Sequence, residues 1–116
     1  MKIQLLYFSG CPNLELARKN LFEAIEKSKI KHYHIEEIEL KTEEEALKYK
    51  FPGSPTIRIN GVDVDSSYID NGNYGLVCRL YKVGEKFYSA PTVDMIKEAV
   101  EDAKFYEGIK EAGGCC

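Results

Sequence analysis

The sequence predicts an α/β fold in which a central mixed sheet is flanked by helices. Near its start, an apolar run typical of a buried strand passes through a glycine-containing turn into a segment of helical periodicity. Further on, a β-branched run is followed by Asn60-Gly61, a strong signal for a type I′ hairpin. Because a right-handed crossover makes the first two strands parallel and a hairpin makes its strands antiparallel, the sheet is expected to be mixed.

Residues 2–8 are the expected first strand, and residues 12–28 the first helix, with Pro12 at its first position. Residues 31–40 alternate as a second strand, with a register change near Glu36-Glu37. Thr42 and Glu45 have the spacing of a capping box for a short helix over 43–49. The apolar positions expected to face inward are Leu14, Ala17, Leu21, Ala24 and Ile25 in the helix, and Tyr33, Ile35, Ile38 and Leu40 in the strand.

The second half of the chain predicts a strand over 56–59, a return strand over 62–64 and a surface loop over 65–75. A further strand is expected over 76–81, paired with residues 87–88. Pro91-Thr92 opens a last helix that ends near Gly108. We therefore expect one domain over residues 1–107 and a flexible Gly/Cys tail over 108–116.

The charge of the chain gives no electrostatic case for a nucleic-acid or anionic-membrane partner. It carries 16 basic and 19 acidic residues, for a net charge of -3. Its apolar stretches are far shorter than the ~20 residues of a membrane helix. Met1-Lys2 leads into only a short apolar run, which does not have the pattern of a secretory signal. We expect a cytoplasmic protein, in which the four cysteines are reduced and serve chemistry rather than structural disulfides.

Cys11 is the first candidate for that chemistry. It is expected where the first strand ends and the first helix begins, between Gly10 and Pro12. The positive end of a helix dipole and its free N–H groups favour a thiolate over a thiol. A thiolate attacks disulfides and binds soft metal ions, so Cys11 is the expected nucleophile or ligand.

These residues resemble the thioredoxin superfamily. Gly10-Cys11-Pro12 matches the place of that fold's nucleophilic cysteine, Ser54-Pro55-Thr56 looks like the segment with its cis-proline, and Asn60-Gly61 looks like the hairpin that follows. More narrowly, Cys11, Cys78-Arg79-Leu80-Tyr81 and the terminal cysteines look like small proteins called "DF family (seleno)protein" or alkylmercury-lyase-like. The resemblance implies a thioredoxin-like fold, a cis Ser54–Pro55 bond beside Cys11, and substrate binding at Pro12, Ser54 and Pro55, where the Ser54 backbone hydrogen-bonds an extended thiol substrate.

One departure from that family concerns the second thiol. Dithiol thioredoxins carry a cysteine three residues after the first, where this chain has Leu14. Cys115 and Cys116 follow a Gly-Gly pair, and the nine residues 108–116 span up to ~30 Å at ~3.3 Å each. The tail is therefore expected to reach Cys11 and to supply a resolving thiol.

Two functions from different classes remain open at this point, beside a third possibility, a thioredoxin-fold interaction domain without chemistry, for which Leu14 is the best support. The first is a thiol–disulfide oxidoreductase in which Cys11 attacks an oxidised protein or a small thiol such as glutathione, and Cys115 or Cys116 resolves the mixed disulfide. It needs no cofactor. The second is a soft-metal protein that holds Hg, Cu or As through thiolates, with organomercurial cleavage as a catalytic variant. Its expected ligands are Cys11, Cys78, Cys115 and Cys116, although the alternation around Cys78 favours a buried structural thiol there.

Overall fold

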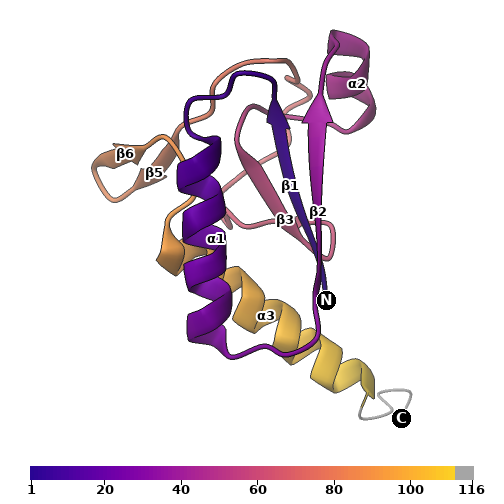
Figure 1. The fold of residues 1–116 in the computed structure, drawn as a ribbon, viewed down its shortest axis with the longest axis vertical. Coiled ribbons are helices and arrows are strands. Elements are labelled where there is room, and N and C mark those ends of the chain that lie inside the picture. The colour runs from indigo at the N-terminus through magenta and orange to yellow at the C-terminus, as the bar shows by residue number, and fades with distance from the viewer. Residues whose placement is uncertain (112–116) are drawn as a thin grey trace.

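The computed structural model describes residues 1–111 of the chain. Four strands form one mixed sheet in the order β2-β1-β3-β4 (Figure 1). β1 (Lys2–Phe8) lies parallel to β2 (His34–Leu40) and antiparallel to β3 (Thr56–Ile59), which pairs with β4 (Val62–Asp63). The predicted α/β class and the mixed sheet are confirmed.

Helices cover both faces of this sheet, and each face has its own core. α1 (Leu14–Ser28) and α3 (Val93–Glu111) pack together on one face. α2 (Glu43–Lys48) lies on the other face, as Figure 1 shows. The buried side chains of the larger core include Ile3, Leu5, Leu21, Ile57, Ile96 and Val100. Those of the smaller core are Leu6, Leu40, Ala46 and Phe51.

The local signals for turns and caps act as expected. Asn60 and Gly61 have φ of 51° and 84°, the positive values that a type I′ turn requires. At the start of α2, the Thr42 hydroxyl accepts a hydrogen bond from the Glu45 N–H at 3.1 Å. The Glu45 carboxylate in turn accepts from the N–H of Lys41, at 3.2 Å. This reciprocal cap explains why so short a helix begins where it does.

The second strand differs from its prediction. It begins at His34, and its ladder with β1 is continuous from Lys2↔His34 to Phe8↔Leu40, so the expected register change does not exist. Ile35 packs on the larger core while Ile38 and Leu40 pack on the smaller one. A parallel strand covered on both faces needs no strict alternation, which is why its sequence was misread.

The predicted strand over 76–81 is wrong as well. β5 (Tyr81–Val83) instead pairs with β6 (Lys86–Tyr88) in a separate hairpin. Residues 76–80 are irregular except for one isolated parallel bridge between Ser54 and Cys78.

α3 begins as predicted but continues past Gly108 to Glu111. The rest of the predicted tail, with Cys115 and Cys116, lies outside the described residues. Within 1–111, no helix combines the length and apolarity of a membrane span.

Candidate functional site

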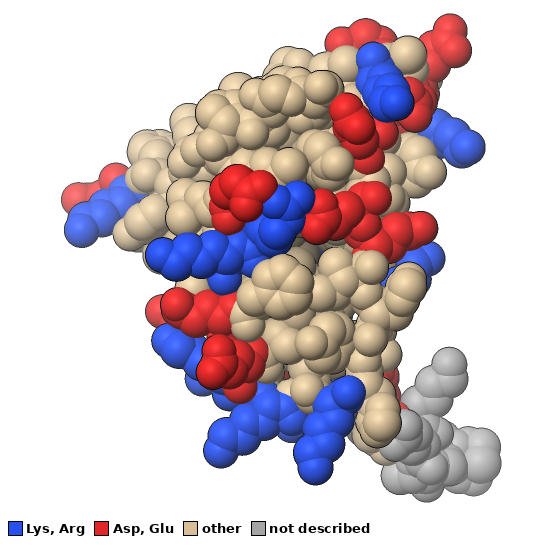
Figure 2. All heavy atoms as spheres, viewed as in Figure 1, with Lys and Arg blue, Asp and Glu red and all other residues tan. Residues whose placement is uncertain are grey.

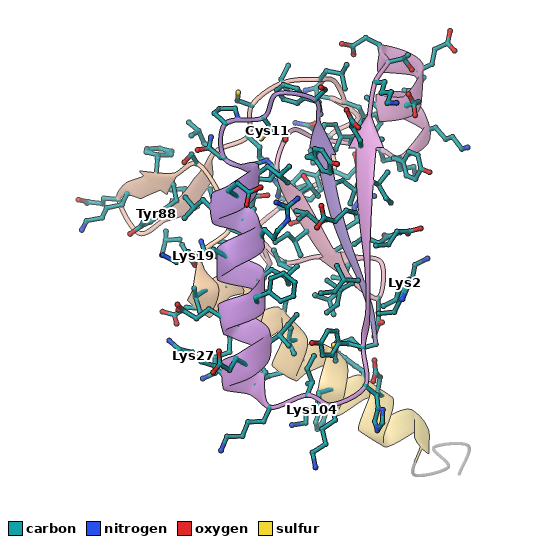
Figure 3. All side chains as sticks on the ribbon, in the orientation of Figure 1. Lys2, Cys11, Lys19, Lys27, Tyr88 and Lys104 are labelled. Atoms are coloured by element: carbon teal, nitrogen blue, oxygen red, sulfur yellow. The ribbon has the colours of Figure 1, made fainter. Side chains whose placement is uncertain are left out.

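Cys11 lies in the loop between β1 and α1, at the end of the molecule where β1 finishes (Figure 3). Its N–H donates to the Phe8 carbonyl at 3.2 Å, so a tight turn joins the strand to the thiol. Gly10 supplies this turn with a φ of 83°. The Cys11 side chain is a free thiol, and the residue is half-buried. The thiol therefore stands where the sequence places it, between a strand end and a helix start.

The helix starts two residues later than predicted. Asn13 is the N-cap of α1 and Leu14 its first residue, so exposed Pro12 lies before the helix instead of at its first position. The first i→i−4 bond runs from the Ala17 N–H to the Asn13 carbonyl, at 3.0 Å. Cys11 consequently precedes the N-cap by two residues, still at the positive end of a 15-residue helix.

The segment before β3 lies beside the end of β1. The Ser54–Pro55 peptide bond is cis, which is what the resemblance implies. The N–H of Phe8 donates to the hydroxyl of buried Ser54, at 3.4 Å. Ser54 therefore links the proline segment to the end of β1, next to the turn that contains Cys11.

The backbone of Ser54 is not open to a substrate. Its N–H donates to the Val77 carbonyl at 2.8 Å, and its carbonyl accepts from the Arg79 N–H at 3.0 Å. We expected the Ser54 backbone to hydrogen-bond an extended substrate. This is wrong for the Ser54 N–H, because its only hydrogen is already donated to Val77. The chain's own residues 77–79 take the place that such a substrate strand would need.

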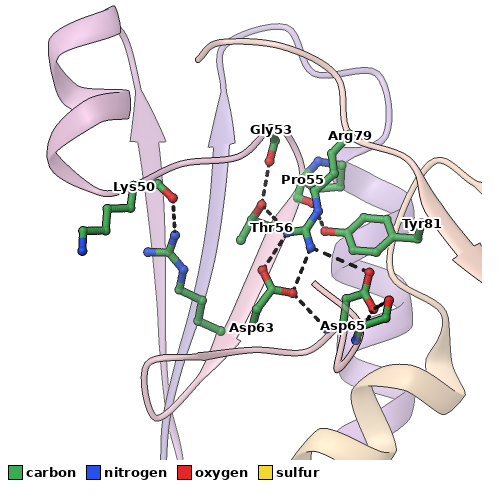
Figure 4. Close-up of polar contacts among 10 residues, drawn as sticks. Lys50, Gly53, Pro55, Thr56, Asp63, Asp65, Arg79 and Tyr81 are labelled. Carbon is green, nitrogen blue, oxygen red and sulfur yellow. Dashed lines mark hydrogen bonds and ion pairs between the residues drawn. The ribbon is translucent and has the colours of Figure 1, made fainter. Parts of the chain in front are cut away.

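A buried polar cluster holds those residues down (Figure 4). The Arg79 guanidinium donates to both carboxylate oxygens of Asp63, at 2.7 and 3.0 Å, and to the Thr56 hydroxyl at 3.0 Å. Asp65 lies 4.0 Å from the same guanidinium. The Tyr81 hydroxyl donates to the carbonyl of Pro55. Through these contacts β4 and the residues after it are fastened to the proline segment.

Arg79 keeps its charge although it is only 8% exposed. Burial is the largest single influence and opposes that charge, but the hydrogen bonds to Asp63 together with the electrostatic attraction of Tyr81, Asp63 and Asp65 raise the pKa of the guanidinium. Its Cζ lies 4.4 Å from the ring centroid of Tyr81 and 4.8 Å from that of Tyr68, a cation–π arrangement. Burial also raises the pKa of the Tyr81 hydroxyl, which remains a hydrogen-bond donor at neutral pH.

This cluster is not among the residues predicted from the sequence. The sequence does contain a usable signal, since Asp63 and Asp65 lie two residues apart and so do Arg79 and Tyr81, the spacing that places side chains on one side of an extended segment. Arg79 and Tyr81 are the buried members of the 76–81 segment, whereas Leu80 is 64% exposed. The side that carries Cys78 was expected to be buried, whereas Arg79 is buried instead because the Asp63 carboxylate compensates its charge.

Cys78 is exposed, which overturns the expectation of a buried structural thiol. The cause is the same alternation, because Arg79 points into the cluster and its neighbour must point away. Cys11 and Cys78 are free thiols. Residues 1–111 hold no group of three or more His, Cys, Asp or Glu side chains suited to a metal ion. The expected soft-metal set thus depends on Cys115 and Cys116, which lie outside the described residues.

The segments that surround the two thiols carry no charged residues of their own. Three segments meet there, residues 7–14, 51–57 and 71–78, and none contains Lys, Arg, Asp or Glu. Backbone hydrogen bonds link the second and third of them, from Gly75 N–H to Phe51 and from Ser54 N–H to Val77. Figure 2 shows the uncharged expanse at the end that carries the β1–α1 loop, while charged side chains gather elsewhere on that face. These segments offer apolar contacts and neutral hydrogen-bonding groups.

Comparisons with protein-family models, with curated proteins and with solved structures found no match to this chain.

Proposed function

We propose that the chain has a thioredoxin-like fold and acts as a thiol–disulfide oxidoreductase with Cys11 as its nucleophile. The observation that carries the proposal is the placement of a half-buried free thiol at a strand-to-helix turn, beside the Ser54–Pro55 segment. The order of elements supports the fold: a parallel β1–α1–β2 unit precedes an antiparallel β3–β4 hairpin and a helix on the face of α1.

The chemistry begins with the Cys11 thiolate. Its sulfur attacks one sulfur of a substrate disulfide, a new S–S bond forms, and the other substrate sulfur leaves as a thiolate. A second thiolate then attacks the Cys11 sulfur and releases the remaining substrate thiol. The disulfide left on Cys11, either with a second cysteine of the chain or with the thiol from solution, is then reduced by further external thiol, which becomes the released disulfide and returns Cys11 to its thiol form. Leu14 holds the position of a local second thiol, so the second attack comes from elsewhere in the chain or from solution.

The uncharged segments around the thiols favour an oxidised protein over glutathione as the substrate. Glutathione carries two carboxylates, and the three segments around the thiols offer no Lys or Arg to pair with them. Leu16 in the first turn of α1 and Val77 next to Cys78 are 44% and 54% exposed. Such side chains suit apolar contact with a partner surface. A cytoplasmic location fits this activity, because thiols there are kept reduced.

Dithiothreitol-driven reduction of insulin disulfides tests the proposal. Turnover is expected in the wild-type chain and at least ~100-fold lower in Cys11→Ser, because an alcohol is a far weaker nucleophile than a thiolate. Ser9→Ala, a change at an exposed residue of the same loop, serves as the matched control and is expected to keep wild-type turnover. Equal turnover in the Cys11→Ser and wild-type chains would remove the basis of the proposal.

A further inference from the structure

Cys78 lies directly opposite Ser54. The two hydrogen bonds between Ser54 and residues 77 and 79 form a parallel bridge in which Cys78 is the partner of Ser54. Paired strands lie about 5 Å apart, and paired residues share a side of the ladder. The backbone of Cys78 is therefore held beside the proline segment by the hydrogen bonds of its two neighbours.

The buried side chains of Arg79 and Tyr81 also hold the segment that contains Cys78 in place. Arg79 and Tyr81 are buried and bound to Asp63 and to the Pro55 carbonyl, as described above. A Cβ on Gly53 would lie 2.9 Å from the Cβ of Arg79, so the two backbones approach as closely as glycine allows. Because Arg79 points inward, Cys78 points outward and is exposed. The sulfur has access to solvent while its backbone has little freedom.

Cys11 is connected to Ser54 through the backbone of Phe8. The Ser54 hydroxyl accepts from Phe8, and the Phe8 carbonyl accepts from Cys11, at 3.4 and 3.2 Å. Ser54 is thus bound on one side to the strand end that carries Cys11 and on the other to the segment that carries Cys78. Figure 1 shows the β1–α1 loop and the chain leading to β5 at one end of the molecule.

The Cys11 loop contains a glycine that faces open space. Gly10 has a φ of 83°, and a Cβ added there would meet no atom within 4 Å beyond its two chain neighbours. A disulfide needs Cα atoms about 4.4–6.8 Å apart. A movement of this loop toward the fixed Cys78 is the motion that would bring the two sulfurs together.

We propose that Cys78 is the resolving thiol of Cys11. This inference rests on the proposed function and names the second thiol that Leu14 does not supply. The Cys78 thiolate attacks the Cys11 sulfur of the mixed disulfide, a Cys11–Cys78 bond forms, and the substrate sulfur leaves as a thiolate that takes up a proton. The protein loses two electrons to the substrate disulfide overall, and an external dithiol such as dithiothreitol restores them.

The test uses the full chain with Cys115→Ser and Cys116→Ser, so that Cys11 and Cys78 are the two cysteines left. The reduced protein is mixed with hydroxyethyl disulfide, an uncharged probe, quenched with acid over time and weighed by mass spectrometry. The expected sequence is a transient mercaptoethanol adduct on Cys11, followed by an intramolecular disulfide that is 2 Da lighter than the reduced chain. Adding Cys78→Ser is expected to lengthen the life of the adduct at least ~10-fold, since a tethered thiol acts at millimolar effective concentration.

The outcomes separate the two proposals. An adduct on Cys11 that lasts equally long with and without Cys78 overturns the role of Cys78 and leaves the nucleophile in place. A disulfide between two chains instead of within one also overturns it. Failure of Cys11 to form any adduct, while Cys78 does, overturns the proposed function itself. Circular dichroism of the Cys78→Ser variant is expected to match the wild type, because the exposed side chain contributes little to packing.

Discussion

Replacement of Arg79 by methionine is the most informative change to the framework that holds Cys78. Methionine keeps an unbranched apolar stem and removes the guanidinium, with its two bonds to Asp63 and one to Thr56. The Asp63 side chain is 11% exposed and Asp65 13%, so two carboxylates lose their cation in a largely dry place. Breaking a buried ion pair on one side costs about 3–5 kcal/mol. Because both carboxylates keep some access to water, we expect the lower end of this range.

A loss of about 3 kcal/mol is a large part of the 5–15 kcal/mol typical of domains, and it corresponds to roughly 12 °C in Tm for a chain of this size. Urea unfolding followed by circular dichroism measures it, and an unchanged slope keeps the comparison valid. The Asp63→Asn/Arg79→Met double variant is expected to recover part of the loss, since the uncompensated charge of Asp63 is gone.

Lys104→Met, at an exposed position of α3, is the matched control and should change the unfolding free energy by less than about 0.5 kcal/mol. A loss below about 1 kcal/mol in Arg79→Met would refute the reasoning that the cluster fastens the 76–81 segment. A loss of the expected size should also be accompanied by slower closure of the Cys11–Cys78 disulfide.

Two further predictions concern the same end of the molecule. Gly53→Ala should lower the unfolding free energy by more than Gly72→Ala. Both glycines have positive φ, but only a Cβ on Gly53 would also lie 2.9 Å from the Cβ of Arg79. Chemical denaturation of the two variants measures the difference, and equal losses would contradict the prediction. The hydroxyl of Tyr74 and then the N–H of Gly72 hold the pKa of Asp70 below its usual value, so the stability that these contacts confer is present above pH ~4 and is lost as the pH falls through the lowered pKa. Carboxyl ¹³C NMR titration should find the pKa of Asp70 higher in Tyr74→Phe than in the wild type, and an unchanged value would argue against that hydrogen bond.

The main elements of the fold could be predicted from the sequence because the motifs that specify them are short and local. The first strand has the predicted bounds, as does β3, and the Asn60-Gly61 turn and Thr42 cap follow from short motifs whose physics involves few neighbours. Cys11 was located for the same reason, since a strand end and a helix start are visible in sequence.

The 76–81 segment was misread because its structure depends on distant residues. The predicted alternation holds only over residues 78–81, where Arg79 and Tyr81 are buried and Cys78 and Leu80 are exposed. The partners that bury Arg79 and Tyr81, Asp63 and Pro55, lie far away in the chain. The same distance conceals the pairing of Cys78 with Ser54. Periodicity alone does not reveal which residue a strand will meet, so the candidate site was incomplete until the fold brought these segments together.

Selective labelling of the thiols tests the central claim most directly. The fully reduced wild-type chain is treated with a substoichiometric amount of 4,4′-dithiodipyridine at neutral pH, quenched with acid and mapped by peptide mass spectrometry. The account predicts that Cys11 is the first sulfur to be modified, and that the pyridyl group is then displaced as Cys11 joins Cys78. Modification of Cys78, Cys115 or Cys116 while Cys11 stays unreacted would contradict the assignment of Cys11 as the nucleophile.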